Sequence, residues 1–315
     1  MLPTFIWFII FVVSLFVLVR ASGYFTESAE KIGLYFGLPD FIVGVTIVAI
    51  GTSLPEIISS IFAVLRNSSE IVIGNVLGSN ITNIFLVVGL AAIVGRKLKI
   101  NYELIHIDLP LLMGSALFLT VTIWDGAFTL PEAILCLAGA VVYFFHAVST
   151  KKKRAGIITN QGLKTRKIEW KTVIIMFISA FFIFLGGRYT IESVIKLSGI
   201  LNIGKEIIAA SAIALGTSLP ELVVTIIAAR RGRPEIAIGN VLGSNIFNAL
   251  AVMGIPALIG NLTIPQNILT FVLPMMLIAS LLFFFMSQDK EITSWEGWLL
   301  LIFYAFFIMK LLKLC

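Results

Sequence analysis

Charged residues are scarce in this sequence, and so are cysteine and histidine. Only 13% of the 315 residues are charged and 59% are hydrophobic, whereas a soluble domain has about 25% charged residues. The composition therefore excludes an ordinary soluble protein. The two cysteines, Cys136 and Cys315, fit neither a disulfide framework nor a thiolate metal site. We expect no cofactor, and soft metals are disfavoured because they prefer Cys or His ligands.

Long apolar runs take up most of the chain. A helix needs roughly 20 mainly apolar residues to cross a bilayer. Ten such runs occur, at about 4–22, 41–65, 71–95, 105–124, 128–148, 170–187, 206–229, 236–259, 265–286 and 294–314. The predicted fold class is an all-α membrane protein with ten transmembrane helices. The first run lacks a basic start and a small-residue cleavage site, so we interpret it as a retained span.

The basic residues predict the orientation. The formal net charge is +6, and cytoplasmic loops carry an excess of Lys and Arg. The largest basic cluster lies in the hydrophilic linker at 149–169 and just after it: Lys151, Lys152, Lys153, Arg154, Lys164, Arg166, Lys167 and Lys171. A cytoplasmic linker puts both termini outside. We expect a multi-pass protein of the cell (plasma) membrane, whose partners are ions and lipid rather than nucleic acid or an obligate protein.

A repeat divides the chain into two halves. Residues 51–83 align without a gap to residues 216–248, and 21 of the 33 positions are identical. We expect an N-terminal five-helix repeat at 1–148 and a C-terminal five-helix repeat at 170–315. An odd number of spans turns the second half upside down in the membrane, as in many secondary transporters, which bind their substrate near mid-depth at the repeat interface.

Each repeat contains the sequence GTSLPE in the middle of an apolar run. Pro55 and Pro220 lack an N–H and clash with the preceding turn, so we expect a helix break that frees carbonyl oxygens nearby. Glu56 and Glu221 lie close to the predicted centre of the bilayer, where an ionisable side chain indicates a functional site. The alternative is a protonated glutamate that merely bonds a neighbouring helix, which two matched copies disfavour.

The next span of each half carries a polar stripe. Asn, Ser and Asn recur at i, i+4 and i+8 on one helix face, as Asn75, Ser79 and Asn83 and as Asn240, Ser244 and Asn248. These side chains either line a ligand or only hold helices together, and we favour the first interpretation. With the carboxylates and the motif hydroxyls they form an all-oxygen, dianionic site of the kind that binds Ca²⁺.

At these residues the sequence resembles the Ca²⁺/cation antiporter superfamily, in particular its prokaryotic sodium/calcium exchanger branch. Both GTSLPE copies and both GNVLGSN copies carry the resemblance, which covers nearly the whole chain. It implies an antiporter, not an enzyme, that exchanges Ca²⁺ for Na⁺ by alternating access. The first and sixth spans would slide together over the other helices.

The resemblance also implies a set of ligands. Glu56 and Glu221 would bind the central Ca²⁺ together with Thr52 and Thr217. The flanking Na⁺ sites would be formed by the hydroxyls of Ser53, Ser79, Ser218 and Ser244 and the carbonyls of Ala49 and Ala214. Asn83 and Asn248 would lie between these sites.

One position departs from the exchanger pattern, where one of the two last stripe residues is often an aspartate. Here both Asn83 and Asn248 are amides, which leaves stoichiometry and proton sensitivity open. Any proton inhibition should then act through Glu56 and Glu221, and full pH-dependent Ca²⁺ transport by Glu56→Gln and Glu221→Gln would contradict this assignment.

Other functions stay open from the sequence. Proton-coupled or K⁺-dependent exchange would use the same fold, although the serine-rich GSN motif favours Na⁺. A cation channel belongs to another class and fits poorly with paired buried glutamates. An intramembrane enzyme would need a nucleophile with a base partner, which the sequence does not offer.

Overall fold

The computed structural model describes residues 2–35, 49–99, 107–155 and 169–314. These parts of the chain are helical almost throughout, with four short strands. The elements, in chain order, are α1 (Leu2–Tyr35), α3 (Ala49–Thr52), α4 (Leu54–Leu65), α5 (Glu70–Ile81), η2 (Thr82–Val88), α6 (Gly89–Gly95), β1 (Lys97–Lys99), α7 (Leu109–Thr122), β2 (Ala127–Phe128), α8 (Leu130–Ala155), α9 (Trp170–Leu201), α10 (Lys205–Ile208), η4 (Ala209–Ile213), α11 (Ala214–Thr217), α12 (Leu219–Arg230), α13 (Pro234–Phe247), η5 (Asn248–Val252), α14 (Met253–Ala257), β3 (Leu262–Thr263), η6 (Ile268–Val272), α15 (Leu273–Met286), η7 (Ser287–Asp289), β4 (Glu291–Thr293) and α16 (Ser294–Leu311).

Several helices in the described parts of the chain are long and apolar enough to cross a membrane. Six qualify singly, and the pair Lys205–Thr217 and Leu219–Arg230, bent by 43°, makes a seventh. Three shorter apolar helices, Leu54–Leu65, Leu109–Thr122 and Leu130–Phe145, fall where the sequence predicts the second, fourth and fifth spans. Residues 41–48 of the second expected span, and most of the expected linker, lie outside the described residues. The protein is therefore a multi-pass membrane protein.

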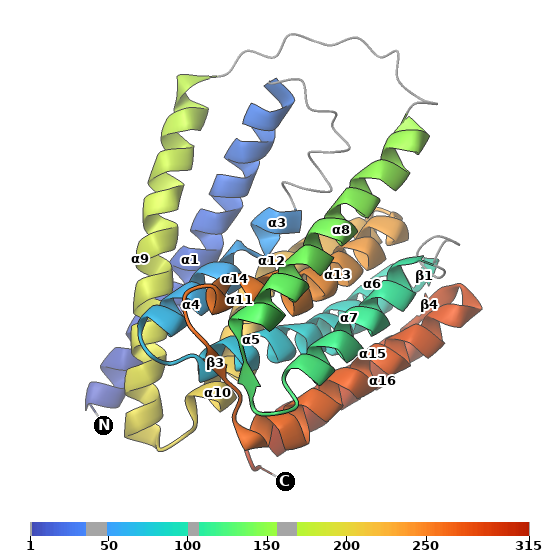
Figure 1. The fold of residues 1–315 in the computed structure, drawn as a ribbon. Helices are drawn as coiled ribbons and strands as arrows, with labels where there is room; N and C mark the ends of the chain where they lie inside the picture. The colour runs from blue at the N-terminus through green and yellow to red at the C-terminus, as the bar shows by residue number, and fades with distance from the viewer. Residues whose placement is uncertain (1, 36–48, 100–106, 156–168, 315) are drawn as a thin grey trace.

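The helices α1 and α9 pack along one another at one side of the molecule (Figure 1). They continue to Tyr35 and Leu201, well beyond the ends at 22 and 187 expected from hydropathy. The apolar run marks only the part in hydrocarbon, and the helix itself continues through a polar turn. A side chain at Gly186 would meet the backbone of Leu18 at 2.8 Å, so a small residue here permits the close packing of the pair.

Burial separates central from peripheral helices. The most apolar stretch of Glu70–Gly95 is 83% buried and that of Ile236–Ala257 is 72% buried, whereas those of α1 and α9 are only 28% and 22% buried. Large apolar side chains such as Phe16 and Phe177 are exposed on the peripheral pair. In a membrane these faces meet lipid, while the stripe-bearing helices α5 and α13 form the centre.

Central packing joins the two halves of the chain. In the first half, α5 lies against α10 and η4 of the second half. A Cβ at Gly78 would lie 2.5 Å from the carbonyl oxygen of Ala210, and one at Gly74 would collide with the carbonyl oxygen of Glu206. Gly74 and Gly78 form a GxxxG pattern, and small residues at this spacing permit the close approach of the two halves here. The equivalent Gly239 meets nothing within 4 Å among the described residues, and the segment matching α10 falls within 36–48.

Two antiparallel ribbons also connect the halves. β1 pairs with β4, with Lys97 opposite Thr293, and β2 pairs with β3, with Phe128 opposite Leu262. The ribbons lie at opposite ends of the helix bundle in Figure 1. Each therefore ties a strand of one half to a strand of the other at one end of the bundle.

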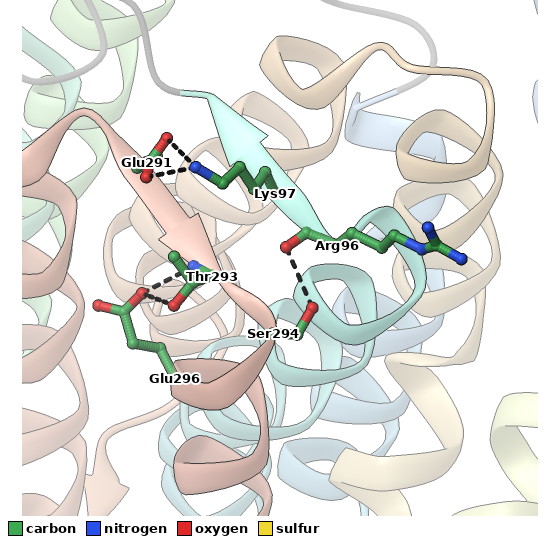
Figure 2. Close-up of polar contacts among 6 residues, drawn as sticks. All are labelled: Arg96, Lys97, Glu291, Thr293, Ser294 and Glu296. Atoms are coloured by element: carbon green, nitrogen blue, oxygen red, sulfur yellow. Dashed lines mark hydrogen bonds and ion pairs between the residues drawn. The ribbon is translucent and has the colours of Figure 1, made fainter.

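Polar contacts fix the β1–β4 ribbon to the helix that follows it (Figure 2). The Nζ of Lys97 pairs with Glu291 at 2.9 Å, and the hydroxyl of Ser294 donates to the carbonyl of Arg96 at 3.0 Å. Thr293 and Glu296 form a capping box at the start of α16, in which Glu296 accepts from the Thr293 N–H at 2.7 Å. This box satisfies backbone donors that a helix start leaves unpaired.

The chain ends agree with an even number of spans. Figure 1 shows the N- and C-termini at one end of the bundle, and the ends of α8 and α9 that face the linker at the other. The end of α8 and the start of α9 therefore lie at the end of the bundle opposite the two termini.

Candidate cation site

The two GTSLPE motifs form matching helix breaks, as the prolines predict. Ser53 separates α3 from α4, and Ser218 separates α11 from α12, with nearly the same backbone angles (φ −89°, ψ 6° and φ −80°, ψ 3°). Each proline follows in the first turn of the new helix, where its missing N–H costs nothing. At each break, the C-terminal end of one short helix therefore meets the N-terminal end of the next.

Each glutamate lies in the first turn of the helix that follows its break. Glu56 belongs to α4 and Glu221 to α12, and both are 1% exposed. A helix start carries a partial positive charge that favours an ionised carboxylate, and the preceding helix end presents carbonyl oxygens that suit a cation. Each helix break thus brings a carboxylate and backbone carbonyl oxygens to the same place.

Hydroxyls from both halves surround Glu221. The hydroxyl of Ser53, from the first half, donates to Glu221 Oε1 at 3.4 Å, and that of Ser244, from the second half, does so at the same distance. The side chain of Thr52 also faces this carboxylate. Glu56 lies close enough for its charge to act on Glu221. The two carboxylates therefore belong to one polar cluster.

Glu56 has a similar but less bonded environment. The side chains of Thr217 and Ser79, one from each half, lie beside it. Neither of its carboxylate oxygens has a hydrogen-bond partner among the described residues. A buried carboxylate without donors is costly unless a cation or a proton compensates it, so this group is suited to bind a cation.

Residues of both stripes contact the broken helix that carries Glu221. Thr217 donates to Asn75 Oδ1 at 3.3 Å, and Ser79 lies 3.5 Å from the same oxygen. In the second half Asn240 donates to the hydroxyl of Thr225 at 3.0 Å and to the backbone carbonyl of Glu221 at 3.4 Å. Both stripes therefore pack against the segment that carries Glu221.

Four asparagines form a second polar group, and two of them, Asn80 and Asn245, were not singled out from the sequence. Asn80 and Asn245 donate to each other's backbone carbonyls, and their side-chain oxygens accept from Asn248 and Asn83 respectively. Asn80 and Asn245 lie one residue after the stripe serines, so the i, i+4, i+8 pattern passes them by. Their identity in both copies was the available signal.

The backbone at Asn83 and Asn248 is unusual. The helix that begins as α5 widens into the π-helical η2 at Thr82, and α13 widens into η5 at Asn248. A π-helical turn inside an α-helix is often found at functional sites. No residue pattern in the sequence predicts these turns.

The helix break does not free the carbonyl of Ala214, contrary to the expectation from the sequence. Ala49 begins α3 and Ala214 begins α11. The carbonyl of Ala214 accepts from the N–H of Ser218 at 3.1 Å. It stays in the helical hydrogen-bond ladder, although a carbonyl oxygen keeps a second lone pair for a cation.

The cluster offers oxygen ligands of several kinds. Within the described parts of the chain, no three side chains of His, Cys, Asp or Glu gather at one point. Instead, the buried oxygens without a hydrogen-bond partner there include Glu56 Oε1 and Oε2, Glu221 Oε2, Ser218 Oγ, Asn83 Oδ1 and Asn248 Oδ1. Carboxylate, hydroxyl and amide oxygens are the ligands of hard cations.

Comparisons with known proteins agree with this chemistry. The family described as "Sodium/calcium exchanger protein" matches residues 6–149 and 171–313. The chain is 34% identical to the sodium/calcium exchanger MaX1 of Methanosarcina acetivorans, over 96% of this chain and 98% of that protein. It is 32% identical to the inner membrane protein YrbG of Escherichia coli, over 79% and 78%.

Solved structures show the same likeness. The sodium-calcium exchanger NCX_Mj soaked with 2.5 mM Na⁺ and 0.1 mM Ca²⁺ is 28% identical, and the match covers 96% of this chain and 97% of that one with a TM-score of 0.67.

Proposed function

The chain belongs to the sodium/calcium exchanger protein family, whose members exchange cations across membranes, and on this premise we propose that it exchanges Ca²⁺ for Na⁺ by alternating access. One observation carries the proposal. Two buried glutamates, one from each broken helix, are faced by hydroxyls of both halves. Two carboxylates can neutralise one Ca²⁺ or two monovalent cations, so a single site can serve both ions in turn.

The proposed ligands follow from the cluster. Glu56 and Glu221 bind Ca²⁺, assisted by Thr52 and Thr217. The proposed Na⁺ ligands are the hydroxyls of Ser53, Ser79, Ser218 and Ser244 and the carbonyls of Ala49 and Ala214. The amides of Asn83 and Asn248 lie between these sites. The unpaired oxygens of Glu56, Glu221, Ser218 and both stripe asparagines support this assignment.

The proposed architecture has ten spans in two inverted halves, 1–148 and 170–315. The seven candidate spans, the three shorter apolar helices and the reciprocal hydrogen bonds between Asn80 and Asn245 support it. The halves bring their glutamates together at one site, which is the arrangement of inverted-repeat transporters.

Alternating access is proposed to use α1 and α9. These helices contact each other more extensively than they contact the rest of the bundle, and they expose large apolar side chains. A pair that is internally tight and loosely attached can slide as a unit past the site. The central helices, tied by two ribbons, would stay fixed.

The proposed location is the cell membrane, with the linker in the cytoplasm and both termini outside. Figure 1 shows the two termini at the end of the bundle opposite the end of α8 and the start of α9, which supports a common side for both termini. The basic residues of the linker favour the cytoplasm for the other side.

Transport in proteoliposomes tests the proposal. Vesicles loaded with Na⁺ and diluted into Na⁺-free buffer should take up ⁴⁵Ca²⁺, and uptake should stop when the Na⁺ gradient is collapsed. Uptake that follows a pH gradient and ignores Na⁺ would contradict Na⁺ coupling in favour of H⁺. Ca²⁺ current without a counter-ion would indicate a channel.

A further inference from the structure

The four buried asparagines have a defined hydrogen-bond direction. Asn80 Nδ2 lies 3.2 Å from the backbone oxygen of Asn245, and Asn245 Nδ2 lies 3.3 Å from the backbone oxygen of Asn80. A backbone carbonyl only accepts, and an amide donates only through its nitrogen. The orientation of both side chains is therefore determined by the backbone rather than by choice of amide flip.

The orientation of Asn80 and Asn245 also determines the orientation of the stripe residues Asn248 and Asn83. Because their nitrogens face the backbone carbonyls, Asn80 and Asn245 present their side-chain oxygens, which only accept, to the stripe residues. Asn248 Nδ2 donates to Asn80 Oδ1 at 3.2 Å, and Asn83 Nδ2 donates to Asn245 Oδ1 at 3.0 Å. The nitrogens of Asn83 and Asn248 thus point into the group, and their oxygens must point away from it.

Those two oxygens are the buried ones without partners. Asn83 is fully buried and Asn248 is 1% exposed, and the Oδ1 of each has no hydrogen bond among the described residues. The segments that carry them are packed on the glutamate helices: η2 contacts α12, which bears Glu221, and η5 contacts α4, which bears Glu56. The amide group therefore leaves two buried carbonyl oxygens without partners among the described residues, on segments that contact the glutamate-bearing helices.

We infer that Asn80 and Asn245 are positioning residues, each of which orients the cation-ligating amide of the opposite half. This inference rests on the proposed function of the cluster as a cation site. Asn80 of the first half fixes Asn248 of the second, and Asn245 of the second half fixes Asn83 of the first. Neither Asn80 nor Asn245 touches the cation in this account.

The hydrogen bonds within the group restrict the side chains at positions 83 and 248. Each of these side chains must donate a hydrogen bond to an oxygen, which an amide can do at any pH and a carboxyl group can do only when protonated. The group thus favours a neutral side chain at both positions. This explains in physical terms why two asparagines can stand together at the centre of a site that already holds two carboxylates.

Ca²⁺ self-exchange tests the inference without involving a coupling ion. Proteoliposomes loaded with unlabelled Ca²⁺ take up ⁴⁵Ca²⁺ with no Na⁺ present, and the KM and maximal rate are measured between about pH 5 and pH 8. Asn80→Leu removes the acceptor that holds Asn248, so we expect the KM for Ca²⁺ to rise about tenfold while the maximal rate changes little. An unchanged KM would overturn the inference.

Asn80→Asp supplies a variant of the same shape. When protonated, Asp at this position donates to the Asn245 carbonyl and accepts from Asn248, as the asparagine does; when ionised it has no donor. The ratio of its KM to that of the unmodified protein should be near one at acid pH and rise as the pH rises. Asn245→Asp should behave in the same way through Asn83.

A flat or falling ratio would overturn the inference, since an effect of packing alone does not follow the protonation of an isosteric side chain. Ser115→Ala removes a hydroxyl that donates to the carbonyl of Leu112 in its own helix at 2.9 Å; it is the control and should leave both constants unchanged. Because self-exchange needs no Na⁺, a failure of Na⁺-driven uptake would refute the coupling ion and leave this result standing.

Discussion

The two halves of the chain share their motifs but not all their contacts. Ser53 donates to Glu221, whereas its equivalent Ser218 has no partner among the described residues. Arg66 pairs with Glu192 at 3.4 Å, whereas Glu27, the equivalent of Glu192, pairs with Lys31 on its own helix.

In the proposed inverted-repeat architecture, a contact made in one half and not in the other describes the conformation rather than the sequence. We expect the contacts that differ to exchange when access changes sides. The asparagine group, whose bonds are the same in both directions, should stay intact.

The largest expected effect on transport concerns the glutamate that each half contributes to the site. Glu56→Gln and Glu221→Gln should each reduce Na⁺-driven ⁴⁵Ca²⁺ uptake by about 100-fold or more, because ligand charge sets Ca²⁺ affinity and every 1.4 kcal/mol is a factor of ten. Initial rates in proteoliposomes measure this. If one variant kept more than a tenth of the activity, the halves would not contribute equally.

The second prediction concerns the glycine through which the first half packs on the second. Gly78→Ala places a Cβ against the backbone of Ala210, whereas a Cβ at the exposed Gly114 meets nothing within 4 Å among the described residues. Overpacking costs about 1–3 kcal/mol, so Gly78→Ala should lower the thermal unfolding temperature in detergent and Gly114→Ala should not. Equal shifts would contradict close packing of the two halves at Gly78.

The fold and the site were predictable from the sequence to different depths. The helix breaks at Pro55 and Pro220 are confirmed, because a proline acts locally on its own helix. The ten-span count stays a prediction, since hydropathy measures hydrocarbon length and the described helices depart from it, most clearly in α1 and α9.

The features that sequence reasoning missed depend on distant partners. The ribbons pair residues such as Lys97 and Thr293, which no local pattern links, although the T-x-x-E box at Thr293–Glu296 was readable as a helix start. The π-helical turn at Asn248 and the roles of Asn80 and Asn245 need the packed structure to be seen.

The third prediction uses the serines at the two breaks. In Na⁺-free self-exchange, Ser53→Ala should raise the KM for Ca²⁺ about fivefold, since a hydrogen bond to a charged group contributes about 1.5–3 kcal/mol in full and less at 3.4 Å. Ser218→Ala should leave it near the unmodified value. In Na⁺-driven exchange, both variants should raise the KM for Na⁺, because both serines are proposed Na⁺ ligands. Equal effects on Ca²⁺ would remove this difference between the halves.

The smallest effect belongs to the exposed ion pair. Arg66→Gln loses the contact with Glu192, and an exposed pair contributes about 0.2–1 kcal/mol, which is up to about fivefold in a conformational ratio. Arg231→Gln, the equivalent change, should shift access the opposite way. Alkylation of Ser218→Cys by a membrane-impermeant reagent, from one side at a time, measures both, and shifts in the same direction would contradict exchange of the contacts.

The central claim is that the two halves build one Ca²⁺ site. Equilibrium dialysis of the purified protein against ⁴⁵Ca²⁺ tests it most directly, with Glu56→Gln and Glu221→Gln measured beside the unmodified chain. The account predicts about one Ca²⁺ per chain at saturation and its loss in either variant. Two Ca²⁺ per chain, with one retained in each variant, would show two separate sites and contradict the account.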